Sequence, residues 1–306
     1  MRITIRQLEV FDTVATLGSV TDAAERLGMS QSAVSSALTD LQFIMKRPLF
    51  ARARGRKLQI TDEGKRLRPH IRSFLSEAQD IEAGVEAPLQ GTLVIGASAT
   101  IAETVLPEIC VRFMNFHPGV QIHIQSATSG ELFLSVARFE LETALIEYFP
   151  AIEGLELIKW RTDELWLVVA PTHSLAGKKR LKIKQLVGMN WCSREAHASV
   201  SSRLRVLLHE ELGQMNTSLV ATSNWAVRLA AIAGGGIACL SKSMVEEDVA
   251  SGKLVRLNVV DFHFTRTLSL ARPKAMRRSR LALEFDRFLF ENSEDKNPPF
   301  DRDSSV

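Results

Sequence analysis

Near the start of the chain, apolar residues recur at helical spacing in two short stretches separated by a turn. The apolar positions between Leu8 and Ala15 lie three or four apart, which predicts an amphipathic helix over residues 5–17. Ser19 and Asp22 can form a capping box at the start of a second helix. The apolar face of this second helix consists of Val20, Ala23, Ala24 and Leu27. The pattern therefore predicts two short helices that pack together.

A third helix is predicted from the cap residue Ser30 to about Phe43, and its two sides differ in character. The inner side is apolar and consists of Val34, Ala37, Leu38 and Leu41. The outer side is small, polar and uncharged, and it consists of Gln31, Ser32, Ser35, Ser36 and Thr39. Short hydroxyl and amide side chains suit a helix that enters the major groove of DNA, where they can reach base edges and phosphates. An ordinary serine-rich solvent face is the alternative.

Basic residues dominate the segment after the third helix. Between Ile44 and Arg72 there are ten Lys and Arg residues against two acids, so this stretch carries +8 and the rest of the chain −5, for a net charge of +3. Such a block favours a polyanionic partner, although a solvated basic helix face is the plain alternative. Two short strands around Gly55 would form a hairpin wing whose Arg52 and Arg54 contact the DNA backbone.

One long helix is expected beyond this hairpin. Thr61 can cap a helix that runs to about Ala87, where Pro88 and Gly91 end it. Its apolar stripe consists of Leu67, Ile71, Phe74, Leu75, Ala78 and Ile81. Because an isolated stripe of this length needs a partner, the pattern predicts a linker and dimerisation helix.

From Gly91 onward, strand patterns alternate with helix patterns. The strand candidates are residues 93–95, 120–124, 143–146, 165–170, 190–193, 217–222, 236–240 and 267–271. The helix candidates are residues 102–116, 132–139, 200–211, 225–233 and 280–290. This order predicts an α/β fold with a parallel sheet flanked by helices. Residues 293–306 are polar and are expected to be frayed.

Length and composition narrow the class of protein. A chain of 306 residues suffices for two or three domains, and 45% hydrophobic with 24% charged residues excludes a disordered chain. We find no apolar run long enough to span a bilayer and no secretion signal, so we expect a cytoplasmic protein without membrane contact. The cysteines Cys110, Cys192 and Cys239 are widely spaced, which argues against a disulfide framework and a structural zinc site. No metal and no cofactor is expected.

Five segments, in order, closely resemble the LysR-type transcriptional regulators. They are residues 4–11 (TIRQLEVF), 23–27 (AAERL), 30–35 (SQSAVS), 49–52 (LFAR) and 61–64 (TDEG). The resemblance implies a winged helix-turn-helix domain in which Gln31, Ser32, Ser35 and Ser36 face bases and phosphates and Arg52 contacts the DNA backbone. The sequence departs from the family pattern at Lys46, where Gly is usual, at Gln42, where Glu is common, and at Ser36, where many members have Arg or Gln. These departures leave the fold in place but make the operator sequence unpredictable.

The resemblance also implies a two-lobed effector domain, similar to the periplasmic solute-binding proteins, with a ligand between its lobes. The expected division is a DNA-binding domain (1–60), a linker and dimerisation helix (61–90), lobe I (91–161 with 266–292), lobe II (162–265) and a tail (293–306). Family members of this kind are commonly tetramers, and many sense small carboxylates or inorganic oxyanions. We therefore expect homodimers or homotetramers that bind an inverted-repeat operator, respond to a small anion and contact RNA polymerase.

Hydroxyl-rich loops after the expected strands are the candidate effector site, because ligands of such sheets bind where strand ends meet helix N-termini. The candidate residues are Ser98, Thr100, Thr128, Ser129, Glu147, Arg194, Ser223 and Asn224. Arg194 and the nearby His197 could supply positive charge, whereas Glu147 would repel an anion unless it pairs with Arg194. The alternative for each Ser or Thr is that it merely caps a helix.

Three other functions fit the sequence less well. Residues 96–100 (GASAT) resemble a nucleophile elbow but lack its final Gly, and no Asp–His pair is evident, so no catalytic residue is expected. A redox sensor would need a reactive thiol, for which Cys192 is the candidate, since Cys110 and Cys239 fit buried apolar positions. A structural DNA-binding protein would not need the long C-terminal region.

Overall fold

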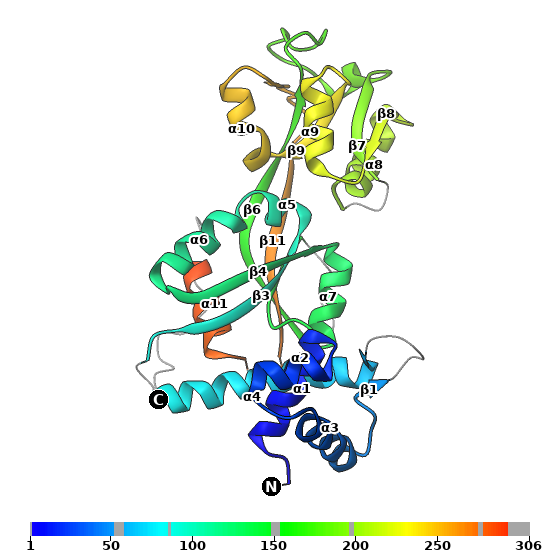
Figure 1. Ribbon diagram of the computed structural model, residues 1–306. Helices are drawn as coiled ribbons and strands as arrows, with labels where there is room; N and C mark the ends of the chain where they lie inside the picture. The colour runs from blue at the N-terminus through cyan, green and yellow to red at the C-terminus, as the bar shows by residue number, and fades with distance from the viewer. Residues whose placement is uncertain are drawn as a thin grey trace.

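The computed structural model describes residues 2–51, 58–84, 87–147, 154–195, 199–274 and 278–292. A small helical domain, a long connecting helix and a larger α/β domain follow one another along the chain (Figure 1). In the part of the chain that the structure describes, every helix is too short or too polar to cross a membrane.

The N-terminal domain consists of three helices, as expected from their periodicity. They are α1 (Ile5–Leu17), α2 (Val20–Leu27) and α3 (Gln31–Met45). The Ser19 hydroxyl accepts a hydrogen bond from the N–H of Asp22, and the Ser30 hydroxyl accepts one from Ala33, so hydroxyl caps begin both α2 and α3. A compact apolar cluster joins the three helices, and it includes Val10, Phe11, Val14, Ala23, Ala24, Val34, Leu38 and Leu41. Burial of this cluster fixes which face of α3 points outward.

Two short antiparallel strands follow, β1 (Phe50–Ala51) and β2 (Gln59–Ile60). They form the base of the expected wing. Its tip, which includes Arg52, Arg54 and Gly55, lies outside the described residues.

The connecting helix α4 (Asp62–Ala83) starts where Thr61 predicted, because the Thr61 hydroxyl accepts a hydrogen bond from the N–H of Gly64. It ends before the expected Ala87, since Gly84 adopts a left-handed φ of 94° that stops the helix. Asp12 of α1 accepts hydrogen bonds at 2.8 Å from both Arg68 and Arg72 of α4. These two basic residues are therefore paired within the protein rather than free for an external polyanion.

The larger domain alternates strands and helices, and its described strands belong to one sheet. In chain order the elements are β3 (Gln90–Ser98), α5 (Ala99–Glu103), α6 (Leu106–Phe116), β4 (Gly119–Ala127), α7 (Ser129–Ala137), β5 (Ala144–Glu147), β6 (Leu155–Val169), η1 (Ile183–Leu186), β7 (Asn190–Arg194), α8 (Ser199–Leu212), β8 (Asn216–Ala221), α9 (Asn224–Ile232), β9 (Ile237–Ser241), α10 (Lys242–Ala250), β10 (Val255–Arg256), β11 (Phe264–Pro273) and α11 (Arg280–Glu291). The strand order is β4-β3-β5-β11-β6-β9-β7-β8, with β10 beside β6.

Two long strands connect the two halves of this domain. β3, β4 and β5 pair in parallel in one half, and β7 pairs in parallel with β8 and β9 in the other. β6 and β11 are antiparallel to each other and run from one half into the other (Figure 1). The chain thus has the small helical domain and the two-lobed α/β domain that the resemblance implied. The sheet is mixed rather than parallel, because β6 and β11 run antiparallel to each other and to their neighbours β9 and β5.

Some elements differ from the sequence prediction. The helix expected over residues 102–116 is two helices, α5 and α6, because Pro107 favours a new first turn there. Helix α10 was not predicted, since its sequence has no clear apolar stripe and Ser241 makes no side-chain cap bond. The strand expected from Leu165 begins ten residues earlier, at Leu155, because its first part packs against β11.

Candidate functional site

The outer face of α3 is exposed to solvent as predicted. Gln31, Ser32, Ser35, Ser36 and Thr39 are all exposed, while Val34 and Leu38 between them are buried. Thr39 donates its hydroxyl hydrogen bond to the Ser35 carbonyl at 2.8 Å, and the hydroxyls of Ser30 and Ser32 lie 3.0 Å apart. The face therefore presents small, uncharged hydrogen-bonding groups to solvent.

Two departures from the family pattern have a clear structural role. Gln42 accepts hydrogen bonds through its Oε1 from the N–H groups of Leu49 (2.8 Å) and Phe50 (3.1 Å), so its amide oxygen holds the start of β1. Lys46 ends α3 in a left-handed conformation with φ of 54°, a region that Gly enters at lower cost than Lys. Lys46 thus makes this turn in a backbone conformation that Gly adopts more readily.

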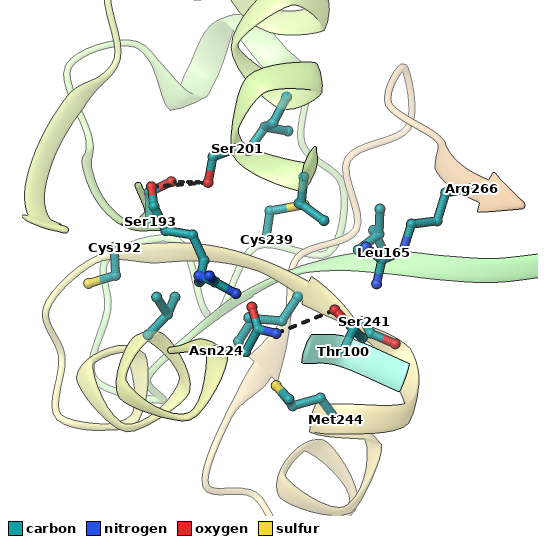
Figure 2. Close-up of a pocket in the computed structure, with 15 residues that line it drawn as sticks. Thr100, Leu165, Cys192, Ser193, Ser201, Asn224, Cys239, Ser241, Met244 and Arg266 are labelled. Carbon is teal, nitrogen blue, oxygen red and sulfur yellow. Dashed lines mark hydrogen bonds between the residues drawn. The ribbon is translucent and has the colours of Figure 1, made fainter. Parts of the chain in front are cut away.

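The second candidate site is a small pocket between the lobes of the α/β domain (Figure 2). Its polar lining consists of Thr100, Ser193, Arg194, Ser201, Asn224, Ser241 and Arg266. Apolar side chains, Cys192 and Cys239 complete the wall. Among the described residues that line the pocket, none is an acid. The space inside that a water-sized molecule can occupy is about 20 Å³, which is enough for about one water molecule.

The lobes touch each other at this pocket. Asn224 begins α9 in one lobe, and its Nδ2 donates a hydrogen bond to Oγ1 of Thr100 in α5 of the other lobe, at 3.3 Å (Figure 2). Thr100 is 7% exposed and Asn224 8% exposed, so this contact is screened from solvent. The expected effector residues Thr100, Arg194 and Asn224 are therefore brought together.

Arg266 of β11 is a pocket residue that sequence reasoning missed. Its Nε donates to Oδ2 of Asp163 at 2.7 Å, and its Nη1 lies 2.5 Å from Oε1 of Glu147. Burial by itself would lower the pKa of Arg266, but the Glu147 and Asp163 carboxylates outweigh it and raise that pKa. Ser241 donates its hydroxyl to Asp163 at 2.6 Å. The guanidinium is thus permanently charged and held between two strands and two acids.

The charge of Glu147 is paired with Arg266, not with Arg194, the partner that the sequence analysis named as the condition for its place in an anion site. The pair forms because β11 lies next to β5 and brings Arg266 to the end of that strand. Arg194 instead lies 3.9 Å from Glu195. Glu147 is also within 3.5 Å of the Thr100 hydroxyl, so it belongs to the same cluster as the pocket.

The other expected residues lie near the strand ends but do not line the pocket. Thr128 caps α7 in a capping box with Glu131, and Ser223 caps α9 through the N–H of Trp225. Ser129 accepts a hydrogen bond from the N–H of Glu147 at 3.2 Å. Ser98 precedes α5, is 4% exposed, and its hydroxyl has no hydrogen-bond partner among the described residues. His197 falls outside the described residues.

Glu103, at the end of α5, is a second group that the sequence did not single out. Burial raises its pKa, while the charge of Arg194 and a hydrogen bond from Asn224 act in the opposite direction and only partly offset that rise. Glu103 therefore faces Arg194 and Asn224 across the gap between the lobes. A Glu next to a polar helix end gave no sequence signal that could distinguish it from a surface acid.

The thiols near the pocket are poor nucleophiles. Cys192, Cys239 and Cys110 are free and buried. Burial raises the pKa of Cys239 to about 12 and also raises the pKa of Cys192. Since the thiolate is the reactive form, these surroundings do not favour a redox switch. Within the described ranges, His, Cys, Asp and Glu side chains form no group that could hold a metal ion.

Two family models match the chain. The model described as "Bacterial regulatory helix-turn-helix protein, lysR family" matches residues 5–65, and the model described as "LysR substrate binding domain" matches residues 86–293. The chain is also 33% identical over 270 residues to the uncharacterised HTH-type transcriptional regulator YeiE of Escherichia coli strain K12. That alignment covers 88% of this chain and 90% of the relative.

Solved structures share the fold. A full-length variant of OxyR from Pseudomonas aeruginosa has a TM-score of 0.71 at 19% identity and covers 97% of this chain and 100% of its own. Full-length CbnR complexed with its target DNA has a TM-score of 0.59 at 18% identity, and the match covers 94% of this chain and 98% of the CbnR chain. The effector-binding domain of QuiR in complex with shikimate has a TM-score of 0.58 at 16% identity, and the match covers 66% of this chain and 97% of the QuiR chain. At these identities the likeness concerns the fold alone.

Proposed function

Since this chain belongs to the LysR family of bacterial transcriptional regulators, we propose that it binds an operator through the outer face of α3 while a small anion occupies the pocket between its lobes. Membership of this family makes the chain a DNA-binding regulator with an effector-binding domain, and members of the family are not enzymes. The residues that contact DNA, the charge of the effector and the assembly are our proposal.

The exposed and uncharged outer face of α3 is the observation that carries the DNA-binding part. Gln31, Ser32, Ser35, Ser36 and Thr39 share that face. A major groove presents donors and acceptors that such short side chains can reach. We place Arg52 and Arg54 against the phosphates beside this helix.

Selection of bound fragments from genomic DNA by the full-length protein tests this proposal. We expect enrichment of an inverted repeat whose half-sites lie about one helical turn, roughly 34–36 Å, or a multiple of it apart. Enrichment that depends only on length and ionic strength, without a common sequence, would contradict readout by α3.

The effector part rests on the pocket at Thr100, Arg194 and Asn224. Two guanidinium groups, Arg194 and Arg266, line it together with hydroxyl and amide groups, and none of its described lining residues is an acid. These groups donate hydrogen bonds, as an anion requires. QuiR, which shares the fold, is known in complex with shikimate, a carboxylate. In a more open cleft the effector could also contact the other expected residues, which are Ser98, Thr128, Ser129, Ser223 and Glu147.

We propose that α4 also joins two chains into a dimer, and that dimers pair into tetramers. Phe74 and Ile81 of α4 are 41% and 74% exposed, which leaves part of its apolar stripe uncovered in the single chain. A change in lobe closure would then alter the bend of the operator and the contact with RNA polymerase in the cytoplasm. The division at residues 1–60, 61–90, 91–161 with 266–292, 162–265 and 293–306 belongs to the same proposal. Sedimentation of the full-length protein with and without DNA tests the assembly.

A further inference from the structure

Buried polar atoms that lack a hydrogen-bond partner within the described residues gather around the pocket between the lobes. Arg194 Nε and Arg266 Nη2 are donors without an acceptor. Glu103 Oε2 and Glu147 Oε2 are acceptors without a donor. Arg266 and Glu147 have side chains that are only 2% and 8% exposed, so bulk water does not satisfy them. Buried polar atoms are nearly always paired in folded proteins, so these four call for a ligand or for bound water.

The unpaired atoms include both hydrogen-bond donors, on the arginines, and hydrogen-bond acceptors, on the glutamates. Sulfate or a simple dicarboxylate offers acceptors only, so it would satisfy Arg194 and Arg266 but leave the oxygens of Glu103 and Glu147 without a donor. A ligand that both accepts and donates hydrogen bonds would satisfy all four groups.

The charges around the pocket also disfavour a ligand with two negative charges. Arg266 lies between Asp163, 2.7 Å from its Nε, and Glu147, 2.5 Å from its Nη1, so this trio has one more negative than positive charge. Arg194 lies 3.9 Å from Glu195 and also faces Glu103. The positive charge of the cleft is therefore largely balanced before any effector binds, and a second negative charge on the ligand would face nearby carboxylates in a low-dielectric setting.

We propose that the effector is a small amphoteric molecule, which carries at most one net negative charge and donates at least one hydrogen bond, as hydroxy acids and amino acids do. Its carboxylate accepts from Arg194 and Arg266, and its hydroxyl or ammonium group donates to Glu103 or Glu147. The inference rests on the proposed effector pocket and narrows the chemical class that it takes. The pocket has room for about one water molecule, about 20 Å³, so a molecule of this class needs the lobes to open further before it can enter.

A two-carbon series separates the features of this class with the full-length protein. Acetate has one charge and no donor, glycolate adds a hydroxyl donor, glycine adds an ammonium group, and oxalate adds a second charge. Binding is followed by calorimetry and by the rise in melting temperature. We expect glycolate or glycine to bind about ten-fold tighter than acetate, the effect of one charge-assisted hydrogen bond, and oxalate to bind weaker than acetate.

A variant of Glu103 tests whether the unpaired carboxylates accept a hydrogen bond from the ligand. Glu103→Gln removes one negative charge and adds an amide donor, so it should lower the preference for glycolate over acetate and raise the affinity for oxalate several-fold. Glu284→Gln removes a surface charge that pairs with Arg287 on α11, and it should leave the order of the series unchanged.

The outcomes separate this inference from the proposal on which it rests. Oxalate binding as tightly as glycolate, or acetate binding as tightly as glycolate, would overturn the amphoteric class and leave an anion pocket in place. Failure of all four compounds overturns the amphoteric class. If sulfate and phosphate also fail, the anionic effector is overturned with it.

Discussion

Arg266 and Glu147 form a buried ion pair, with Nη1 and Oε1 2.5 Å apart, where β11 crosses from one lobe to the other. Arg266 also lies directly opposite Asp163 in the β11–β6 register and pairs with it at 2.7 Å. The guanidinium thus ties three strands together beside the effector pocket. Removal of one member leaves uncompensated charge in the interior, whereas removal of all three charges does not.

Arg266→Met should therefore lower the free energy of unfolding of the effector domain by about 3–5 kcal/mol. Urea unfolding followed by fluorescence measures this, since Trp160 and Trp191 are buried in the two halves of the domain. The triple variant with Glu147→Gln and Asp163→Asn should recover most of the loss. Arg287→Met, at an exposed pair on α11, is the matched control and should change the midpoint little. Equal losses in the single and triple variants would mean that packing, rather than charge, gives Arg266 its role.

Asp12 should be important for the junction between the DNA-binding domain and α4. Its carboxylate accepts from Arg68 and Arg72 at 2.8 Å each, and it is 22% exposed. Asp12→Ala leaves two guanidinium groups without their carboxylate partner, although both still donate to the Thr16 hydroxyl, and it should cost about 1.5–3 kcal/mol, typical of hydrogen bonds to charged groups. Thermal unfolding monitored by circular dichroism checks this. Glu9→Ala, which removes an exposed pair with Arg6 on the same helix, is the control and should shift the melting temperature far less.

DNA binding should respond differently to changes in α3 and in the wing. Ser35→Ala removes an exposed hydroxyl from the outer face of α3 and should weaken binding to the selected operator more than binding to unrelated DNA. Arg52→Ala should weaken both and reduce the slope of log affinity against log salt by about one unit. Fluorescence anisotropy at several salt concentrations measures both effects. Ser251→Ala, at the end of α10, is the control, and normal binding by both test variants would refute this surface.

The cysteines should be unreactive in the folded protein. Burial raises the pKa of Cys110 and Cys239 from 9.0 to about 12, so the neutral thiol is the form favoured by folding. The raised thiol pKa makes its full contribution to the free energy of unfolding below pH 9. That contribution is lost as the pH rises from about 9 towards 12. Slow reaction with a thiol reagent in the native protein, and complete reaction in denaturant, would agree with this.

Regulation gives a second test of the thiols. Cys192→Ser should preserve the response to effector, because burial raises the pKa of this thiol and so disfavours the thiolate. Loss of the response in a variant that still binds DNA would instead support a redox switch.

The N-terminal domain could be predicted almost entirely from local sequence. Helix caps at Ser19, Ser30 and Thr61 and the spacing of apolar residues are interactions within a few positions of each other, so they can be recognised without the fold. The same holds for the parallel βαβαβ order that starts at β3. Pro107 could have indicated the break between α5 and α6, but α10 gives no comparable local signal.

The sequence by itself thus determined the order of the domains, the outer face of α3 and the strand ends where Thr100, Arg194 and Asn224 lie. Only the tertiary structure decided which charges meet in the pocket. Arg266 joins Glu147 and Asp163 because β11 runs antiparallel between β5 and β6, and Glu103 faces Arg194 because the two lobes close on each other. Strand pairing and lobe closure arise from contacts distant in sequence, and no local pattern records which partner a buried charge will find.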